Sequence, residues 1–171
     1  MAENIHIKLE PDDYPEHPWL HAGLGFEWNF NHKKLKEDVS DGFPTDNLTD
    51  WWFFKVYMYD HSGFSLALKP FSCKWDSGVY GVVAVRRPSR GGRWHRREKF
   101  LKHLEECIEN LSCWLNGDVH QYTVADDRGD ILDACGGLYG REYAKEVAAN
   151  SALMFLAAIP ASQRGDLKWA C

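Results

Sequence analysis

The sequence predicts an α+β fold, a mainly antiparallel sheet with two long amphipathic helices packed on one of its faces. Several segments alternate apolar and polar residues, as half-buried strands do. Short connections between them leave no room for helical crossovers, and two later segments repeat their apolar residues every three or four positions. The chain has 171 residues without a repeat or a disordered linker, so we expect one domain over residues 1–171.

The N-terminal half supplies most of the expected strands. The segment WWFFKVYMYD is rich in aromatic and β-branched residues, which favour strands. It is followed by two more such segments after short turns, and we expect these three to form an antiparallel meander. The strands predicted in this half are residues 4–9, 23–30, 51–60, 64–70 and 79–87.

The C-terminal half begins with a helical period. Apolar residues between positions 93 and 115 recur every three or four residues, and Gly117 is expected to end this helix in a left-handed conformation. The glycine-rich string CGGLYG is expected to form a tight corner, with a nucleotide-binding loop as the alternative. The predicted order is a hairpin of strands 119–126 and 131–135, the corner 135–140, a helix at 141–158 and a flexible tail from about residue 160.

Composition favours a soluble protein of the cytoplasm. Hydrophobic residues make up 44% and charged residues 26%, and the formal net charge of -5 argues against a general nucleic-acid coat. No apolar run is long enough to cross a membrane, and the N-terminus lacks the features of a signal peptide. Five cysteines without a CxxC pair fit reduced thiols, so we expect neither a metal site nor a cofactor.

Positive charge is concentrated in one segment. Eight of the 20 lysines and arginines lie within residues 86–102, where Glu98 is the single acid. Guanidinium groups bind phosphate and carboxylate, and a helix N-terminus adds backbone N–H donors. The segment therefore predicts a site for a nucleic acid, a nucleotide or an acidic protein face, with a solvated helix start as the alternative. The candidate residues are Arg86, Arg87, Arg90, Arg93, Trp94, Arg96, Arg97 and Lys99.

Two turns carry residue types that can perform chemistry, YDHSG at residues 59–63 and PFSCKWDSG at residues 70–78. In a meander these turns lie at opposite ends of strand 64–70, about 20 Å apart. We therefore expect neither a shared Cys–His nucleophile pair nor a metal site. We interpret the second turn as a structural loop in which the Trp packs against the fold. The loop residues are Trp75, Asp76, Ser77 and Gly78, and the weak catalytic candidates are Cys73, His61, Asp60 and Asp76.

Four strings of the sequence resemble motifs of a family of small proteins from phages and integrated mobile elements. They are the two turns just described, WLNGDVHQY at residues 114–122 and DACGGLYG at residues 133–140. The resemblance covers about residues 51–147, with His120 and Gln121 where the family usually has Tyr and Gly. The resemblance implies an accessory protein of a mobile element and assigns no reaction to it.

These features favour a binding protein over an enzyme. The expected function is inhibition of a host defence complex that targets nucleic acid, of the anti-CRISPR or antirestriction type. Its partner is then a host protein or nucleoprotein complex, with no membrane involved. The alternatives are direct binding of DNA or RNA by residues 86–102 and a small cysteine/histidine enzyme.

Overall fold

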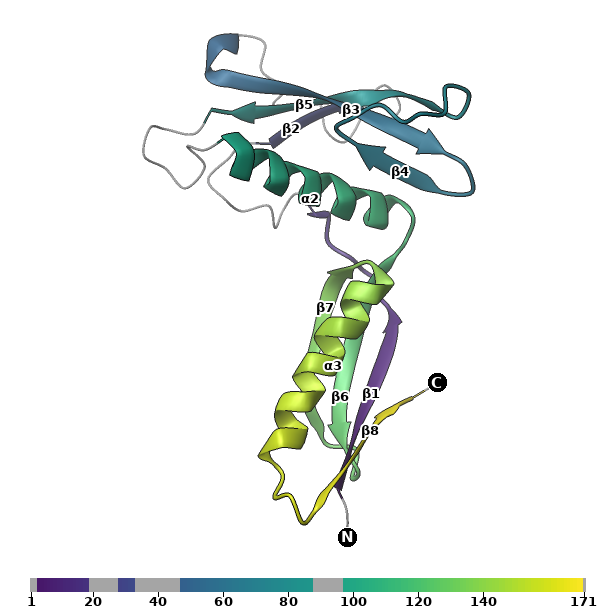
Figure 1. The fold of residues 1–171 in the computed structure, drawn as a ribbon, viewed down its shortest axis with the longest axis vertical. Helices are drawn as coiled ribbons and strands as arrows, with labels where there is room; N and C mark the ends of the chain where they lie inside the picture. The colour runs from purple at the N-terminus through teal and green to yellow at the C-terminus, as the bar shows by residue number, and fades with distance from the viewer. Residues whose placement is uncertain (1–2, 19–27, 33–46, 88–96, 171) are drawn as a thin grey trace. The chain divides into compact units, whose positions relative to one another are not determined.

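The computed structural model describes residues 3–18, 28–32, 47–87 and 97–170 (Figure 1). These residues form an α+β fold with two four-stranded sheets, mostly antiparallel, and two long helices. The chain divides into two compact units, a first unit of Met1–Glu16 and Gly117–Cys171 and a second unit of His17–Asn116. None of the described helices is long and apolar enough to cross a membrane.

The second unit is built on an antiparallel sheet in the order β2-β5-β3-β4. Its middle strands, β3 and β5, pair along their whole length, from Trp51 opposite Arg86 to Tyr59 opposite Ser77. β4 pairs only with β3, so the predicted meander is wrong in its last step. The ten-residue β5 gains more backbone hydrogen bonds from the equally long β3 than the four-residue β4 offers. The elements are β2 (Trp28–His32), the 3-10 turn η1 (Leu48–Asp50), β3 (Trp51–Asp60), β4 (Phe64–Ala67), β5 (Ser77–Arg86) and the helix α2 (Arg97–Leu115).

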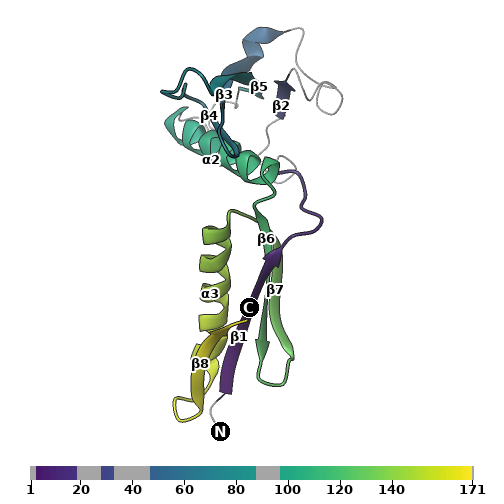
Figure 2. The same cartoon turned by 90° about the vertical axis from the view of Figure 1, so that its right-hand side faces the viewer.

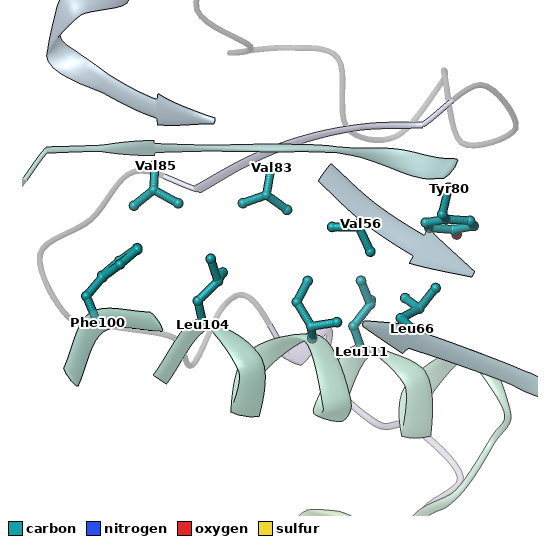
Figure 3. Close-up of a cluster of buried hydrophobic side chains, with 9 residues drawn as sticks. Val56, Leu66, Tyr80, Val83, Val85, Phe100, Leu104 and Leu111 are labelled. Carbon is teal, nitrogen blue, oxygen red and sulfur yellow. The ribbon is translucent and has the colours of Figure 1, made fainter. Parts of the chain in front are cut away.

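The core of the second unit lies between this sheet and α2 (Figure 3). The helix contributes side chains at every third or fourth position, so they share one face. The sheet contributes one face of β3, β4 and β5. The buried residues are Phe100, Leu104, Ile108 and Leu111 from α2 and Val56, Leu66, Tyr80, Val83 and Val85 from the sheet.

The first unit joins both ends of the chain in a mixed sheet, in the order β7-β6-β1-β8 (Figure 2). Its strands are antiparallel except β8, which runs parallel to β1 because α3 carries the chain back along the sheet. Small side chains on α3, Ala144, Ala148 and Ala152, are fully buried and let the helix approach the sheet closely. The elements are β1 (Glu3–Pro11), β6 (Val119–Asp126), β7 (Ile131–Tyr139), α3 (Arg141–Ala158) and β8 (Arg164–Trp169).

The arrangement of sheets and helices differs from the prediction of one sheet under two helices. Each unit has its own sheet and one long described helix. The reason is the long-range pairing of β1 with β6. The second unit lies between these two strands in the sequence, so it forms a separate insertion in the chain of the first unit. Periodicity identifies strands but carries no information about which distant strands pair.

The predicted flexible tail is instead a strand. β8 lies on the free edge of β1, with Ile5 opposite Leu167 and Ile7 opposite Trp169. A Cβ atom at Gly165 would lie 2.5 Å from the backbone oxygen of Glu3, so this approach requires a glycine. The sequence RGDLKW mixes charged and apolar residues without a clear strand period, so the pattern did not indicate pairing.

The predicted corner at residues 135–140 is also a strand, because β7 continues to Tyr139. Gly137 has φ +69° and forms part of a bulge opposite β6. Its N–H donates to Asp12 Oδ2 over 2.8 Å, and a Cβ atom at Gly136 would lie 2.9 Å from the same oxygen. The Asp12 carboxylate thus binds the Gly137 N–H, a donor that a phosphate would need. This contact argues against the nucleotide-loop alternative. The left-handed conformation predicted for Gly117 is present, with φ +69°.

Candidate functional site

The two chemistry-bearing turns of the second unit meet at one end of its sheet. β5 starts beside the end of β3, so the backbone N–H of Asp60 donates to the carbonyl of Asp76 over 2.8 Å. The predicted separation of about 20 Å is therefore wrong, because it assumed that β5 pairs with β4. We call Asp60, His61, Cys73, Asp76 and Ser77 the two-loop cluster.

Asp76 is the centre of this cluster. Its Oδ2 atom lies 3.6 Å from His61 Nδ1 and 3.7 Å from Cys73 Sγ. The Ser77 hydroxyl donates to the carbonyl of Cys73, which fixes the loop before β5. Ser62 and Gly63 have positive φ angles, which lets the first turn fold back against the second. The two turns are joined by the backbone bond from Asp60 to Asp76 and by the contact of His61 with the Asp76 carboxylate.

This geometry does not favour thiol catalysis. A nucleophilic cysteine needs a base within hydrogen-bond reach and surroundings that favour the thiolate. Here the thiol and the imidazole each contact the same carboxylate oxygen of Asp76 rather than one another. In the described part of the chain no three His, Cys, Asp or Glu side chains are placed to hold a metal ion. The contacts of the cluster are those of two neighbouring turns.

Trp75 is the most exposed large apolar side chain of the second unit's described residues, with 95% of its surface accessible. The prediction that it packs against the fold is therefore wrong. The loop before Trp75 is anchored instead by Phe71, whose ring centroid lies 5.6 Å from that of Tyr59. The Tyr59 ring also stacks on His61, with 6.0 Å between the centroids. On the same end of the sheet Val79 is 59% exposed. A held loop thus presents an indole to solvent.

The positively charged segment is described only at its ends. The backbone N–H of Arg87 donates to Asp50 O over 2.8 Å, and its Nε donates to Trp51 O over 3.4 Å, so this guanidinium helps to fix the start of β3. Lys99 is exposed in the first described turn of α2, and the predicted helix start near residue 93 lies outside the described residues. Arg90, Arg93, Trp94 and Arg96 lie outside the described residues, and the anion site remains a prediction.

The structure also reveals a surface that the sequence analysis missed. Alternate residues of β3 pack on α2, namely Trp52, Phe54, Val56 and Met58. The intervening residues therefore lie on the opposite face of the sheet. They are Trp51, Phe53, Lys55, Tyr57 and Tyr59. The alternation within WWFFKVYMYD was a signal for two faces of different character, but its aromatic residues on both faces obscured which one is buried.

Two acidic side chains in the first unit have structural partners. Asp127 accepts hydrogen bonds from the backbone of Asn4 at 2.8 Å and its side chain at 3.1 Å, and lies 2.8 Å from His6 Nε2. These contacts hold the pKa of Asp127 well below its usual range, and the hydrogen bond from the Asn4 backbone has the largest effect. Asp133 accepts from Tyr122 Oη at 2.7 Å and from the Ser151 hydroxyl, which ties β7 to β6 and α3.

No protein-family model matches the chain, and comparison with curated proteins and with solved structures finds no similar protein. The site is therefore interpreted from its own geometry.

Proposed function

We propose that this protein acts by binding, as an accessory protein of a mobile element that inhibits a host defence complex targeting nucleic acid. The complex is of the kind that anti-CRISPR or antirestriction proteins block, and the protein meets it in the host cytoplasm. Trp75 is the observation that supports binding most directly.

An exposed tryptophan on a held loop is well suited to anchor a protein interface. Tryptophan is among the residues that contribute most binding energy when buried at the centre of an interface. Its side chain presents about 150–250 Å², and burying that area at about 25 cal/mol per Å² is worth up to about 4–6 kcal/mol. Lys74 and Asp76 flank it with opposite charges, which fits a polar rim around an apolar anchor. The partner surface that fits is an apolar pocket in a protein.

The charge distribution supports a nucleic-acid-handling target. Outside residues 86–102 the chain holds 24 of its 25 acids and 12 of its 20 lysines and arginines. A protein surface rich in carboxylates is attracted to the cationic grooves in which such complexes hold nucleic acid. This supports the choice of target, while Trp75 supports the mode of action.

The test measures protection of DNA in cells. Host cells with an active restriction or CRISPR system would express the wild-type protein, Trp75→Ala or Tyr14→Ala and then receive a targeted plasmid. Tyr14 is the matched control, an aromatic residue 92% exposed in the first unit. We expect many transformants with the wild type and Tyr14→Ala, and few with Trp75→Ala.

Two results would contradict the proposal. Wild-type protein that protects plasmids from neither kind of system would remove the anti-defence function. Equal protection by Trp75→Ala would remove the loop as the binding surface. Trp75→Ala should fold normally, because replacement of so exposed a side chain changes the free energy of unfolding by about 0.5 kcal/mol or less. Circular dichroism of each purified variant checks this.

A further inference from the structure

The outer face of the second unit's sheet combines aromatic rings with positive charge. It carries Lys55, Tyr57 and Tyr59 at alternate positions of β3, with Val79 opposite Tyr57 and Val82 opposite Lys55 on β5. We call this surface the β3 platform. Lys55 and Val79 are exposed, and the two tyrosines are partly exposed.

The two tyrosines are too far apart for bases that remain stacked directly on one another. Alternate residues of a strand lie about 6.8 Å apart, roughly twice the 3.4 Å rise per nucleotide of a stacked duplex. Bases that stack separately on Tyr57 and Tyr59 would therefore have to be spread apart. The contacts of Tyr59 with His61 and Phe71 restrict the ring, which lowers the entropy lost when a base stacks on it.

The charges of this face are complementary to phosphate. β3 from Trp51 to Tyr59 and β5 from Ser77 to Arg86 contain no acidic residue. Lys55 lies in the middle of the face and Arg86 lies opposite Trp51 at one end. Asp60 and Asp76 lie at the other end. Asp50 precedes Trp51 at the Arg86 end, so a phosphate is favoured at Lys55, in the middle of the face, with bases directed to the tyrosines.

We propose that the β3 platform binds single-stranded nucleic acid, with bases stacked on Tyr57 and Tyr59 and a phosphate at Lys55. Open sheet faces with aromatic side chains bind unpaired bases because each base has a face to stack, whereas the bases of a duplex are already stacked on one another. This activity is separate from the protein contact of Trp75, although Tyr59 also contacts Phe71 in the loop that carries Trp75.

The experiment measures fluorescence anisotropy of labelled oligothymidylate, oligouridylate and a DNA duplex of the same length with the full chain over a salt series. The variants are Tyr57→Leu, Tyr59→Leu and Lys55→Gln. Leucine keeps an apolar side chain on the sheet but removes the ring. The matched controls are Tyr143→Leu, an exposed tyrosine of α3, and Lys168→Gln, an exposed lysine of β8.

We expect the single strands to bind more tightly than the duplex. Each tyrosine variant should weaken binding by about tenfold, the loss expected for one stacked base. Lys55→Gln should weaken binding at low salt and reduce the slope of log affinity against log salt by about one. The two controls should bind as the wild type does.

Several outcomes would overturn this inference. They are no binding at low salt, equal affinity for duplex and single strand, or unchanged affinity in both tyrosine variants. A concentration-dependent dimer, detected by light scattering and lost in Tyr57→Leu, would show that a second copy of the chain covers this face. Failure here would leave the plasmid-protection test of Trp75 unaffected, so the two proposals fail separately.

Discussion

The side-chain amide of Asn116 pairs with the backbone of Phe64 as a neighbouring strand would. The N–H of Phe64 donates to Asn116 Oδ1 over 2.8 Å, and Asn116 Nδ2 donates to the carbonyl of Phe64 over 2.6 Å. Two residues along β4, the N–H of Leu66 donates to Ser112 Oγ over 2.7 Å. The last turn of α2 thus satisfies backbone groups on the free edge of a short strand, which would otherwise be open to pairing with another chain.

Replacement of Asn116 should destabilise the second unit. Asn116→Ala leaves the Phe64 N–H and carbonyl without these partners and should lower the free energy of unfolding by about 1–3 kcal/mol. Asn116→Asp keeps an acceptor for the N–H and should cost less. Urea denaturation of both variants measures this, with Asn150→Ala on the exposed side of α3 as the control. Equal stability of Asn116→Ala and the wild type would show that water replaces both contacts at no cost.

Removal of the Cys73 thiol separates a binding function from thiol catalysis. Cys73 contributes a weak contact to Asp76 at 3.7 Å, and its carbonyl, which accepts from Ser77, remains in Cys73→Ala. We expect this variant to protect plasmids as well as the wild type does, with a stability change of about 0.5 kcal/mol or less.

The plasmid-protection assay and a thermal melt provide the measurements for Cys73→Ala. Complete loss of protection by a normally folded Cys73→Ala would favour the cysteine enzyme over a binding protein.

Much of the local structure could be predicted from the sequence. The strand at residues 51–60 and the strand at 119–126 have the predicted bounds, and α3 spans Arg141–Ala158 as predicted. These segments have a strong period or composition, and their limits are marked by turn residues. The strand at 64–70 ends early, at Ala67, because the following residues form the loop that carries Trp75.

The candidate site could not be predicted in the same way, because it depends on strand order. His61 and Cys73 are close to one carboxylate only because β5 pairs with β3 instead of β4. Both orders are compatible with the same alternating pattern. The exposure of Trp75 was equally hidden, since a single apolar residue in a loop has no period that indicates its surroundings.

A pair of glycine substitutions tests the close approach of β8 to β1. A Cβ atom at Gly165 would meet the backbone of Glu3 at 2.5 Å, whereas one at Gly78 would meet nothing within 4 Å. Gly165→Ala should therefore force β8 away from β1 and lower the free energy of unfolding by about 1–3 kcal/mol. Gly78→Ala should be neutral or raise it by about 0.4–1 kcal/mol, because alanine restricts the unfolded chain.

Urea denaturation compares the two glycine variants, and hydrogen exchange of the β8 amides reports where Gly165→Ala acts. Faster exchange in β8 than in β6 is the expected pattern. Unchanged protection of β8 in a stable Gly165→Ala would contradict the close approach.

Stability at low pH should depend on Asp127. The hydrogen bonds from Asn4 and His6 favour its ionised form in the folded state, so its folded pKa lies below its unfolded pKa. The folded state then binds fewer protons, and the contribution is complete above the ordinary carboxyl pKa of about 4. It is lost as the pH falls from there through the lower folded pKa.

Asp127→Asn should be less stable than the wild type at pH 7, and this difference should shrink in acid. Thermal melts from neutral to acidic pH measure it, with the exposed Asp13→Asn as the control. A difference that stays constant over that pH range would show that the carboxylate charge adds nothing to its hydrogen bonds.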